Sequence, residues 1–312
     1  MARKKIAVIG GGNVGQTCAH VAAVKNLGDV VITDIVEGMP QGKALDLMEC
    51  RSFSGIDVDI MGTTKYEDIA GSDLVIITAG MARKPGMSRD DLLDANIKIV
   101  KPVAEAIKKF APDSIVLVVS NPLDSMVYLT AQVTGFPKNR VIGSAGVLDS
   151  ARFACFIAME LKVSPRDVQT LVLGGHGDDM VPLVRRTQVN GVPVENLIPQ
   201  DRLAAMVDRT RKAGGEIVAL LKTGSAYFSP GSATVTMAES ILHDQRRIMP
   251  CSVWCEKEYG VGGYFMGVPA ILGSKGVEKV VEIELNAEEK AAFQKSLDSV
   301  KKTVLEMKGK GF

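Results

Sequence analysis

One histidine of the sequence stands in a setting suited to proton transfer. His176 belongs to the segment Gly-Gly-His-Gly-Asp at residues 174–178, which follows an apolar run at 171–173. Glycines on both sides let the backbone bend, so the imidazole can face a cleft instead of a core. The other two histidines, His20 and His243, fall in or at the end of predicted helices, where structural roles suffice.

Two charged residues that could serve this histidine stand three positions apart, at Asp149 and Arg152. Asp149 could hold one imidazole nitrogen, which would fix the tautomer and stabilise the protonated ring. Arg152, on the same helix face, offers the paired N–H groups that a carboxylate prefers. The alternative is a helix N-cap aspartate with a surface arginine, and sequence distance alone leaves both interpretations open.

A glycine-rich segment near the N-terminus has the spacing of a dinucleotide-binding turn. Residues 10–15 read Gly-Gly-Gly-Asn-Val-Gly between a short apolar run and a helix-like stretch. Such glycines permit a tight turn and close approach of a pyrophosphate, which then meets the positive end of the helix. The predicted contacts on this turn are Gly10, Gly12, Asn13, Val14 and Gly15.

An acidic residue completes this pattern. Asp34 follows the turn by about 20 residues, at the end of the next predicted strand. Its carboxylate would accept hydrogen bonds from the adenosine ribose hydroxyls and would repel a 2′-phosphate, and Glu37 adds to that repulsion. We therefore predict NAD over NADP as the cofactor.

The segment at residues 79–89 is predicted to be a lid. It follows the apolar run at 74–79, at the edge of a parallel sheet where ligands bind. Gly80 and Gly86 supply hinge freedom, and Arg83 and Arg89 supply anion-binding groups. A solvated basic loop is the alternative interpretation.

The first half of the chain alternates between short β-branched runs and helix-like stretches. Runs as apolar as Leu-Val-Ile-Ile at 74–77 suit a sheet covered on both faces, and the alternation predicts βαβ units. We therefore predict the α/β class with an N-terminal Rossmann doubly wound parallel sheet. Pro102 should kink or divide the helix that contains it. The predicted strands are 5–10, 30–34, 58–62, 74–79, 115–120 and 140–142, and the predicted helices are 13–27, 38–50, 89–110, 123–134 and 149–161.

The second half has a different organisation. The pair Asn190-Gly191 predicts a hairpin between 183–188 and 192–194. Helices are expected near 200–222 and 233–243, then a strand-rich stretch at 247–282 and a final helix with one apolar stripe. We predict an NAD-binding Rossmann domain at 1–148 and an α+β catalytic domain at 149–312.

Composition excludes several classes of partner. The 312 residues carry 37 Lys+Arg and 36 Asp+Glu, so no bulk positive field exists for nucleic acid or an anionic membrane. The five cysteines are odd in number and scattered, which favours reduced thiols in a cytoplasmic protein and no metal. The apolar run after Arg3 is too short for a signal peptide.

Together these residues resemble the lactate/malate dehydrogenase family, and within it the bacterial-type, lactate-dehydrogenase-like malate enzymes. The resemblance spans essentially the whole chain. Besides the segments above, it rests on Val-Ser-Asn-Pro at 119–122, Leu-Asp-Ser-Ala-Arg at 148–152 and the run 82–92. It implies oxidation of (S)-malate to oxaloacetate with NAD, a reaction of the tricarboxylic acid cycle, by a homodimer or homotetramer.

The resemblance also implies a role for individual residues. His176 would be the acid/base paired with Asp149, and Arg152 would bind the near carboxylate of the substrate. Arg89 would polarise the reacting carbonyl, and Arg83 stands where malate enzymes carry Arg and lactate enzymes usually Gln. The remaining implied contacts are Asn121 to substrate and cofactor, and Val119 and Asn96 near the cofactor. Asp179 stands where relatives commonly have Ser or Thr, and Ser225 receives no assignment.

Three alternatives remain to be weighed. The nearest is a lactate or other 2-hydroxyacid dehydrogenase on the same fold, against which Arg83 argues. A non-catalytic NAD-binding protein is disfavoured because His176, Asp149 and Arg152 are all present. A metal hydrolase built on His176 and Asp178 lacks further histidines to complete a site.

Overall fold

The computed structural model describes residues 3–81 and 89–310, and for Arg89 it describes the backbone alone. Within these ranges most strands of the first half begin and end within a few residues of the predicted bounds. The strands are β1 (Lys5–Ile9), β2 (Asp29–Thr33), β3 (Ile60–Thr63), β4 (Leu74–Ile77), β5 (Ile115–Val118), β6 (Val141–Gly143), β7 (Val168–Gln169), β8 (Val172–Leu173), β9 (Val181–Pro182), β10 (Gln188–Val189), β11 (Val192–Pro193), β12 (Arg247–Cys255), β13 (Tyr264–Gly273) and β14 (Gly276–Val280).

Six of these strands form a parallel sheet in the order β6-β5-β4-β1-β2-β3. The order reverses between β1 and β4, which is the point where open α/β sheets bind ligands. The predicted Rossmann doubly wound sheet and the α/β class are therefore confirmed. β12 then pairs with β6 in the antiparallel sense, and β13 and β14 continue the same sheet outward.

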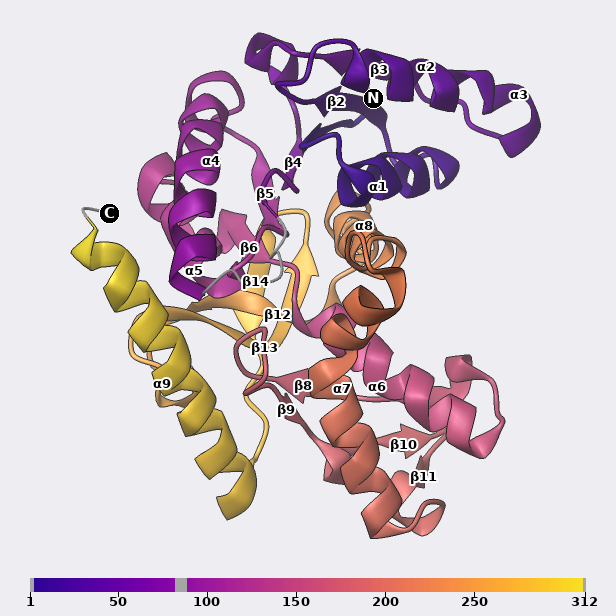
Figure 1. The fold of residues 1–312 in the computed structure, drawn as a ribbon, viewed down its shortest axis with the longest axis vertical. Helices are drawn as coiled ribbons and strands as arrows, with labels where there is room; N and C mark the ends of the chain where they lie inside the picture. The colour runs from indigo at the N-terminus through magenta and orange to yellow at the C-terminus, as the bar shows by residue number, and fades with distance from the viewer. Residues whose placement is uncertain (1–2, 82–88, 311–312) are drawn as a thin grey trace.

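Helices cover both faces of this sheet. α4 and α5 pack together on one side, and α1 packs against α8 on the other (Figure 1). None of the helices in the described ranges is both long and apolar enough to cross a bilayer. The helices are α1 (Asn13–Val24), α2 (Met39–Glu49), α3 (Arg51–Ser54), α4 (Arg89–Phe110), α5 (Leu123–Thr134), α6 (Gly146–Leu161), α7 (Gln200–Leu221), α8 (Phe228–Leu242) and α9 (Ala287–Gly309).

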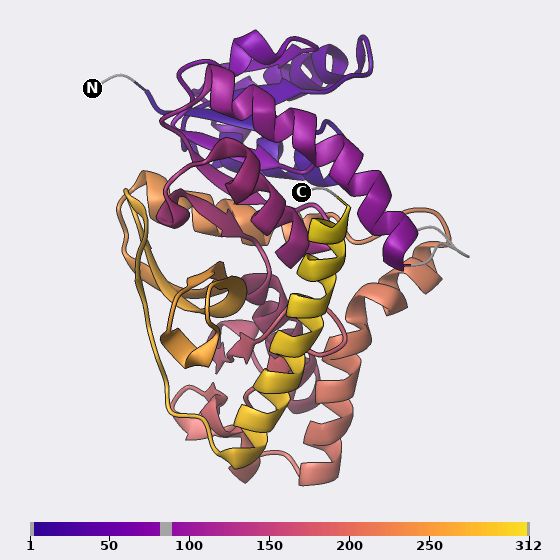
Figure 2. The ribbon, with the colours of Figure 1, turned by 90° about the vertical axis from the view of Figure 1, so that its left-hand side faces the viewer.

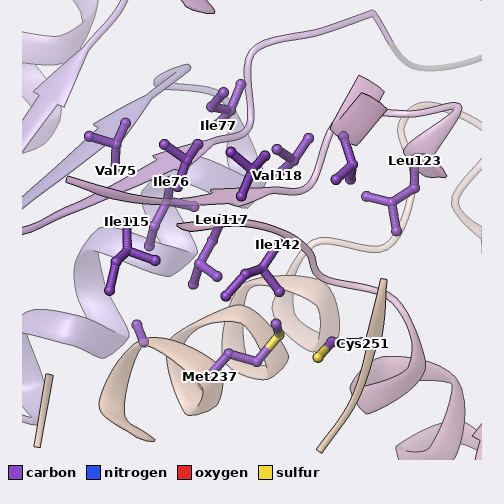
Figure 3. Packing of buried hydrophobic residues seen from close by; sticks show 14 of the residues in the cluster. Val75, Ile76, Ile77, Ile115, Leu117, Val118, Leu123, Ile142, Met237 and Cys251 are labelled. Atoms are coloured by element: carbon purple, nitrogen blue, oxygen red, sulfur yellow. The ribbon is translucent and has the colours of Figure 1, made fainter. Parts of the chain in front are cut away.

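The main core lies on the two faces of the parallel strands. β4 and β5 are buried along their whole length, as expected for apolar strands between helical layers. Figure 3 shows Leu117 and Ile142 packed toward Met237 of α8 and Cys251 of β12. A second apolar cluster, built around Phe153 of α6, stabilises the lower part of the second half. α6 thus starts beside the main core, which includes Ala145, and carries Phe153 into the second cluster.

α4 and α6 are among the helices that differ from their predicted form. α4 continues past Pro102 as a single helix, so the predicted division is absent. Ile97, Val100 and Val103 around the proline are buried, and their packing holds the helix together despite the missing hydrogen bond. α6 begins at Gly146, three residues before the predicted start at Asp149, which places Asp149 inside its first turn.

The second half has the helices and antiparallel strands of the predicted α+β organisation, and its longest strands join the sheet of the first half. β10 and β11 form the predicted hairpin around Asn190-Gly191, although each strand has only two residues. The strand-rich stretch at 247–282 does not make its own sheet but extends the N-terminal one. The predicted division between 148 and 149 falls in the first turn of α6 and stays a prediction.

α9 crosses much of the molecule's length (Figure 2) and packs against α5, β9 and β13. The predicted apolar stripe is buried there, including Phe293, Leu297 and Val300. A capping box at Asn286 and Glu289 fixes its start, because each side chain accepts a hydrogen bond from the other's backbone. α9 therefore connects the first-half helices to the loops of the second half.

The contact between β13 and the loop before His176 generates a stability prediction. A Cβ added at Gly267 would lie 2.1 Å from the carbonyl oxygen of Gly174. We expect Gly267→Ala to lower the free energy of unfolding by about 1–3 kcal/mol, because the backbones must separate. Gly215→Ala in α7 is the matched control, since nothing lies within 4 Å of its Cβ, and it should raise stability by up to about 1 kcal/mol. Urea unfolding of the wild type and both variants measures these changes. Equal unfolding midpoints for Gly267→Ala and Gly215→Ala would contradict the prediction.

Candidate active site

A cavity of about 860 Å³ opens at the carboxyl edge of the parallel sheet. Thr78, Val119 and Ser144 line it, and each directly follows one of the strands β4, β5 and β6. Arg152 of α6 and His176 form part of its lining. The structure therefore brings the predicted acid/base residue to the place where open parallel sheets bind ligands.

His176, Asp149 and Arg152 form one cluster in this cavity. Nδ1 of His176 lies 2.9 Å from Oδ2 of Asp149, and a guanidinium nitrogen of Arg152 donates to Oδ1 at 3.3 Å. The Asp149 side chain is only 2% exposed, so its charge is stabilised mainly by these two partners. Because an ionised carboxylate can only accept, Nδ1 carries a proton and Nε2 is left for a substrate. The surface-arginine interpretation of Arg152 is thereby excluded.

The pKa of His176 is raised above its ordinary value. Burial alone would lower it, since desolvation disfavours the charged ring, and Arg152 acts in the same direction. The charge and hydrogen bond of Asp149, with a smaller contribution from Asp124, outweigh both effects. The imidazole is therefore held more protonated than a free histidine at neutral pH.

Arg152 has an unused donor. Its Nε is buried and has no hydrogen-bond partner among the described residues, while the side chain as a whole is 13% exposed. A buried guanidinium N–H without a partner is costly unless a ligand supplies an acceptor. The fork of Arg152 thus suits a carboxylate bound in the cavity.

The loop that carries His176 is fixed through its backbone. Gly174 N–H donates to the carbonyl of Gly267, and Gly175 N–H donates to Oγ of Ser296 on α9, both at 2.9 Å. His176 N–H donates to Oδ2 of Asp124 at 3.0 Å. Sequence reasoning missed Asp124, and its position three residues after Asn121 was the only available signal.

The glycine turn after β1 has the features of an anion cradle. A Cβ at Gly15 would lie 1.8 Å from the carbonyl oxygen of Gly10, so only glycine lets α1 start this close to β1. α1 has no side-chain N-cap and no acidic residue in its first turn, and nothing lies within 4 Å of a Cβ at exposed Gly12. The N–H groups of the first helical turn have no partner within the helix, and with this open face they fit a pyrophosphate, with Asn13 and Val14 beside it.

Asp34 holds this turn from the end of β2. Its Oδ2 accepts from Gly11 N–H at 2.6 Å and its Oδ1 accepts from Val36 N–H at 3.1 Å. Each oxygen can accept further bonds, so the carboxylate remains able to receive ribose hydroxyls. Lys43 Nζ donates to the carbonyl of Gly11 at 2.6 Å and was missed by the sequence, because α2 places it there from 32 residues away.

The three other predicted contacts, Val119 and Asn121 after β5 and Asn96 on α4, take two different positions. Val119 and Asn121 line the cavity, as a contact to substrate or cofactor requires. Asn96 is fully buried and does not line it. Its side chain pairs with the backbone of Met81 and donates to the carbonyl of Asn121 at 2.5 Å. Asn96 thus ties the start of the predicted lid segment to the Asn121 loop, and its direct contact with cofactor stays a prediction.

Four further residues complete the comparison with the sequence. Arg83 lies outside the described residues, and of Arg89 only the backbone is described, at the start of α4. Asp179 is directed to α9, where it pairs with Lys295 at 2.8 Å and accepts from Ser299. Ser225, for which no role was predicted, lines the cavity. In the described part of the chain no group of three or more His, Cys, Asp or Glu is placed to hold a metal ion.

Family comparisons agree with this geometry. The model of the lactate/malate dehydrogenase NAD-binding domain matches residues 4–143, and that of the α/β C-terminal domain of the same family matches residues 146–310. A malate dehydrogenase of Geobacter sulfurreducens is 58% identical over 99% of this chain and 100% of its own length. A malate dehydrogenase of Heliobacterium modesticaldum is 57% identical over 97% of this chain and 98% of its own.

Solved structures of both activities resemble this fold. A malate dehydrogenase of Cryptosporidium parvum superposes with a TM-score of 0.97 at 44% identity, covering 98% of this chain and 99% of its own. A lactate dehydrogenase of the same organism, complexed with lactic acid and nicotinamide adenine dinucleotide, superposes with 0.96 at 44% identity, covering 99% of each chain. Backbone similarity therefore does not separate the two activities.

The His176–Asp149 contact generates a prediction about titration. Asp149→Asn should lower the pKa of His176, because the neutral amide no longer stabilises the imidazolium. In the wild type the protonated ring contributes stability that is fully present below the unfolded-state pKa and is lost as the pH rises through the higher folded-state pKa. NMR titration of the ring C–H signals measures the shift, and His176→Asn identifies the signal among three histidines. An unchanged midpoint in Asp149→Asn would show that the pair does not set the protonation of His176.

Proposed function

The chain belongs to the lactate/malate dehydrogenase family, and from this premise we propose that it catalyses the reversible NAD-dependent oxidation of (S)-malate to oxaloacetate. The observation that carries the proposal is the cluster of His176, Asp149 and Arg152 in one cavity at the carboxyl edge of the parallel sheet. It combines a proton donor with a binding group for a carboxylate, as an α-keto acid substrate requires. The relatives of highest identity given above carry the name malate dehydrogenase, which supports the choice of substrate.

The residues of the glycine turn would hold the cofactor. The free N–H groups at the start of α1 suit the pyrophosphate, and Asp34 suits the adenosine ribose and opposes a 2′-phosphate. Val119 and Asn121 lie farther along the sheet edge, where the nicotinamide half would reach the cavity. When bound, NAD accepts a hydride from the alcohol carbon of malate, and NADH returns one to the carbonyl carbon of oxaloacetate.

His176 moves the proton that accompanies the hydride. In oxaloacetate reduction its protonated Nε2 donates to the carbonyl oxygen, which becomes the hydroxyl of malate. In malate oxidation the neutral ring accepts that proton back. Asp149 stabilises the imidazolium from the Nδ1 side and fixes the ring orientation, so the same contact serves both directions.

Three arginines would share the charges of the substrate. The Arg152 fork suits the carboxylate next to the reacting carbon, because its buried Nε has no partner in the described part of the chain. Arg89 would stabilise the charge that develops on the carbonyl oxygen, which favours the transition state over the ground state. Arg83 would bind the second carboxylate, the group that distinguishes oxaloacetate from pyruvate. The assignments of Arg83 and Arg89 rest on the sequence pattern of residues 82–92.

A lactate or other 2-hydroxyacid dehydrogenase remains the alternative on the same fold. The two Cryptosporidium structures resemble this chain equally well, so the fold does not separate the activities. Arg83 favours malate, because closing over pyruvate would leave its guanidinium desolvated and without a counter-charge. A non-catalytic NAD-binding role has little support, since nothing in such a role requires the Asp149–His176 pair.

We also propose that the protein is a homo-oligomer and is cytoplasmic. Large apolar side chains are exposed on α2, α3, α7 and α8, among them Phe53 at 78% and Phe228 at 69%. Such side chains are the kind that a subunit interface covers, which supports a homodimer or homotetramer. All five cysteines are free thiols, in keeping with a cytoplasmic protein. Light scattering at two protein concentrations would distinguish monomer, dimer and tetramer.

The main test of the proposed function is NADH oxidation by oxaloacetate. We expect wild-type protein to catalyse it, with NADPH a much poorer reductant. His176→Asn should lower kcat by roughly 10³-fold, because proton transfer by a positioned side chain contributes about 10²–10⁴-fold. His20→Asn, on α1 and outside the cavity lining, is the control and should keep full activity. Wild-type protein that binds NADH but reduces no 2-keto acid would refute the proposal.

Substrate choice is tested at Arg83. We expect kcat/KM for oxaloacetate to exceed that for pyruvate by about 10³, since an unpaired desolvated charge costs about 3–5 kcal/mol and each ~1.4 kcal/mol is tenfold. Arg83→Gln should lower the oxaloacetate value and raise the pyruvate value, while Arg166→Gln at an exposed position outside the cavity lining changes neither. Similar kcat/KM values for both substrates in the wild type would contradict the role of Arg83.

A further inference from the structure

A second carboxylate lies behind the His176 loop. Asp124 is in the first turn of α5 and is 8% exposed. Its Oδ2 accepts from His176 N–H at 3.0 Å, and its Oδ1 accepts from Oγ of Ser252 at 2.8 Å. These partners are 52 and 128 residues away in the chain. One side chain therefore joins α5, the histidine loop and β12 at the wall of the cavity.

The hydrogen bonds that Asp124 makes do not require a charged side chain. Burial raises the pKa of Asp124, and the hydrogen bonds from Ser252 and His176 offset this only in part. An asparagine in this place could accept from His176 N–H and donate to the Ser252 hydroxyl without the cost of desolvating a carboxylate. A carboxylate at this position is therefore better explained by its interaction with the positive charge of the protonated His176 ring.

Asp124 also shares a short segment with Asn121, the predicted substrate contact. The carbonyl of Asn121 accepts from Asn96, and α5 begins two residues later at Leu123. Only Pro122 and Leu123 separate Asn121 from Asp124. The Asn121 segment and the anchor of the histidine loop therefore lie next to each other at the start of α5.

We propose that Asp124 is a positioning residue for His176, which fixes the backbone of the histidine loop to the Asn121 segment and places a second negative charge behind the imidazole. Its catalytic meaning rests on the proposed role of His176 as proton donor. The contact of Asp124 with the His176 loop, and its effect on the titration of the ring, do not depend on which substrate the protein uses.

The sign of the charge effect follows from the groups that face His176. Asp149 of α6 and Asp124 of α5 stabilise the imidazolium, and Arg152 of α6 opposes it. Removing the charge of Asp124 should therefore lower the pKa of His176. The other charged groups of the cavity wall among the described residues are Asp90 at the start of α4, Asp178 and Asp179 on the histidine's own loop, with Asp179 paired to Lys295, and Lys302 and Glu306 on α9.

The test compares two variants with a matched control by NMR titration of His176. Asp124→Asn keeps an acceptor for His176 N–H and a donor for Ser252, and it should move the titration midpoint to lower pH. Ser252→Ala removes a donor that stabilises the ionised Asp124, and it should move the midpoint the same way by less. Thr130→Val is the control, since this buried hydroxyl of α5 donates only to the carbonyl of Met126 and should leave the midpoint unchanged.

Activity supplies a second readout. Asp124→Ala, which removes the anchor as well as the charge, should lower kcat for oxaloacetate reduction by about 10²-fold, including at pH values where His176 is protonated, while the KM for NADH stays within about twofold. Asp124→Asn should lose less, mainly at neutral and higher pH. Wild-type midpoints in both Asp124→Asn and Ser252→Ala would overturn the proposal, as would full activity of Asp124→Ala. If the wild type reduced no oxaloacetate but Asp124→Asn still shifted His176, the proposed function would fail while the positioning role would stand.

Discussion

The site depends on a buried carboxylate that holds an imidazole and a guanidinium at once. Asp149 is nearly inaccessible to solvent, so its charge is stabilised by His176 on one oxygen and Arg152 on the other. Loss of either partner would leave a buried charge insufficiently paired. The three side chains therefore need a fixed relative geometry, and much of the surrounding structure provides it.

Two parts of the fold meet at this contact. α6 begins three residues after β6, so Asp149 and Arg152 project directly from the end of the parallel sheet. His176 arrives from the second half, on a loop held by Gly267 of β13, Ser296 of α9 and Asp124 of α5. Because β12 and β13 extend the same sheet, the loop and α6 rest on one continuous support. His176, the proposed acid/base residue, is thus held beside the sheet edge where the cofactor would lie.

The electrostatics of the cavity follow from this arrangement. Two carboxylates raise the pKa of His176 against burial and Arg152, which keeps a proton available for donation. The buried Nε of Arg152 has no hydrogen-bond partner within residues 3–81 and 90–310, so it is suited to an incoming anion. A dianionic substrate would then complete the balance of charge, and exclusion of water would strengthen each contact. Asp179, which the sequence placed close to this site, forms an ion pair with Lys295 of α9 at 2.8 Å.

The sequence by itself determined the features that are encoded over short distances. Alternation of apolar runs with helix-like stretches predicted the parallel sheet. Glycine spacing identified the turn between β1 and α1, and the three-residue spacing of Asp149 and Arg152 put them on one helix face. Only the tertiary structure decided which distant groups meet. In the structure α4 continues past Pro102, and β12 pairs with β6. Asn96 is buried, Lys43 contacts the glycine turn, and Asp124 contacts the His176 loop. The physical reason is that periodicity and turn chemistry act between near neighbours, whereas hydrogen bonds such as Asp124 to His176 and Ser252 exist only after the whole chain has packed.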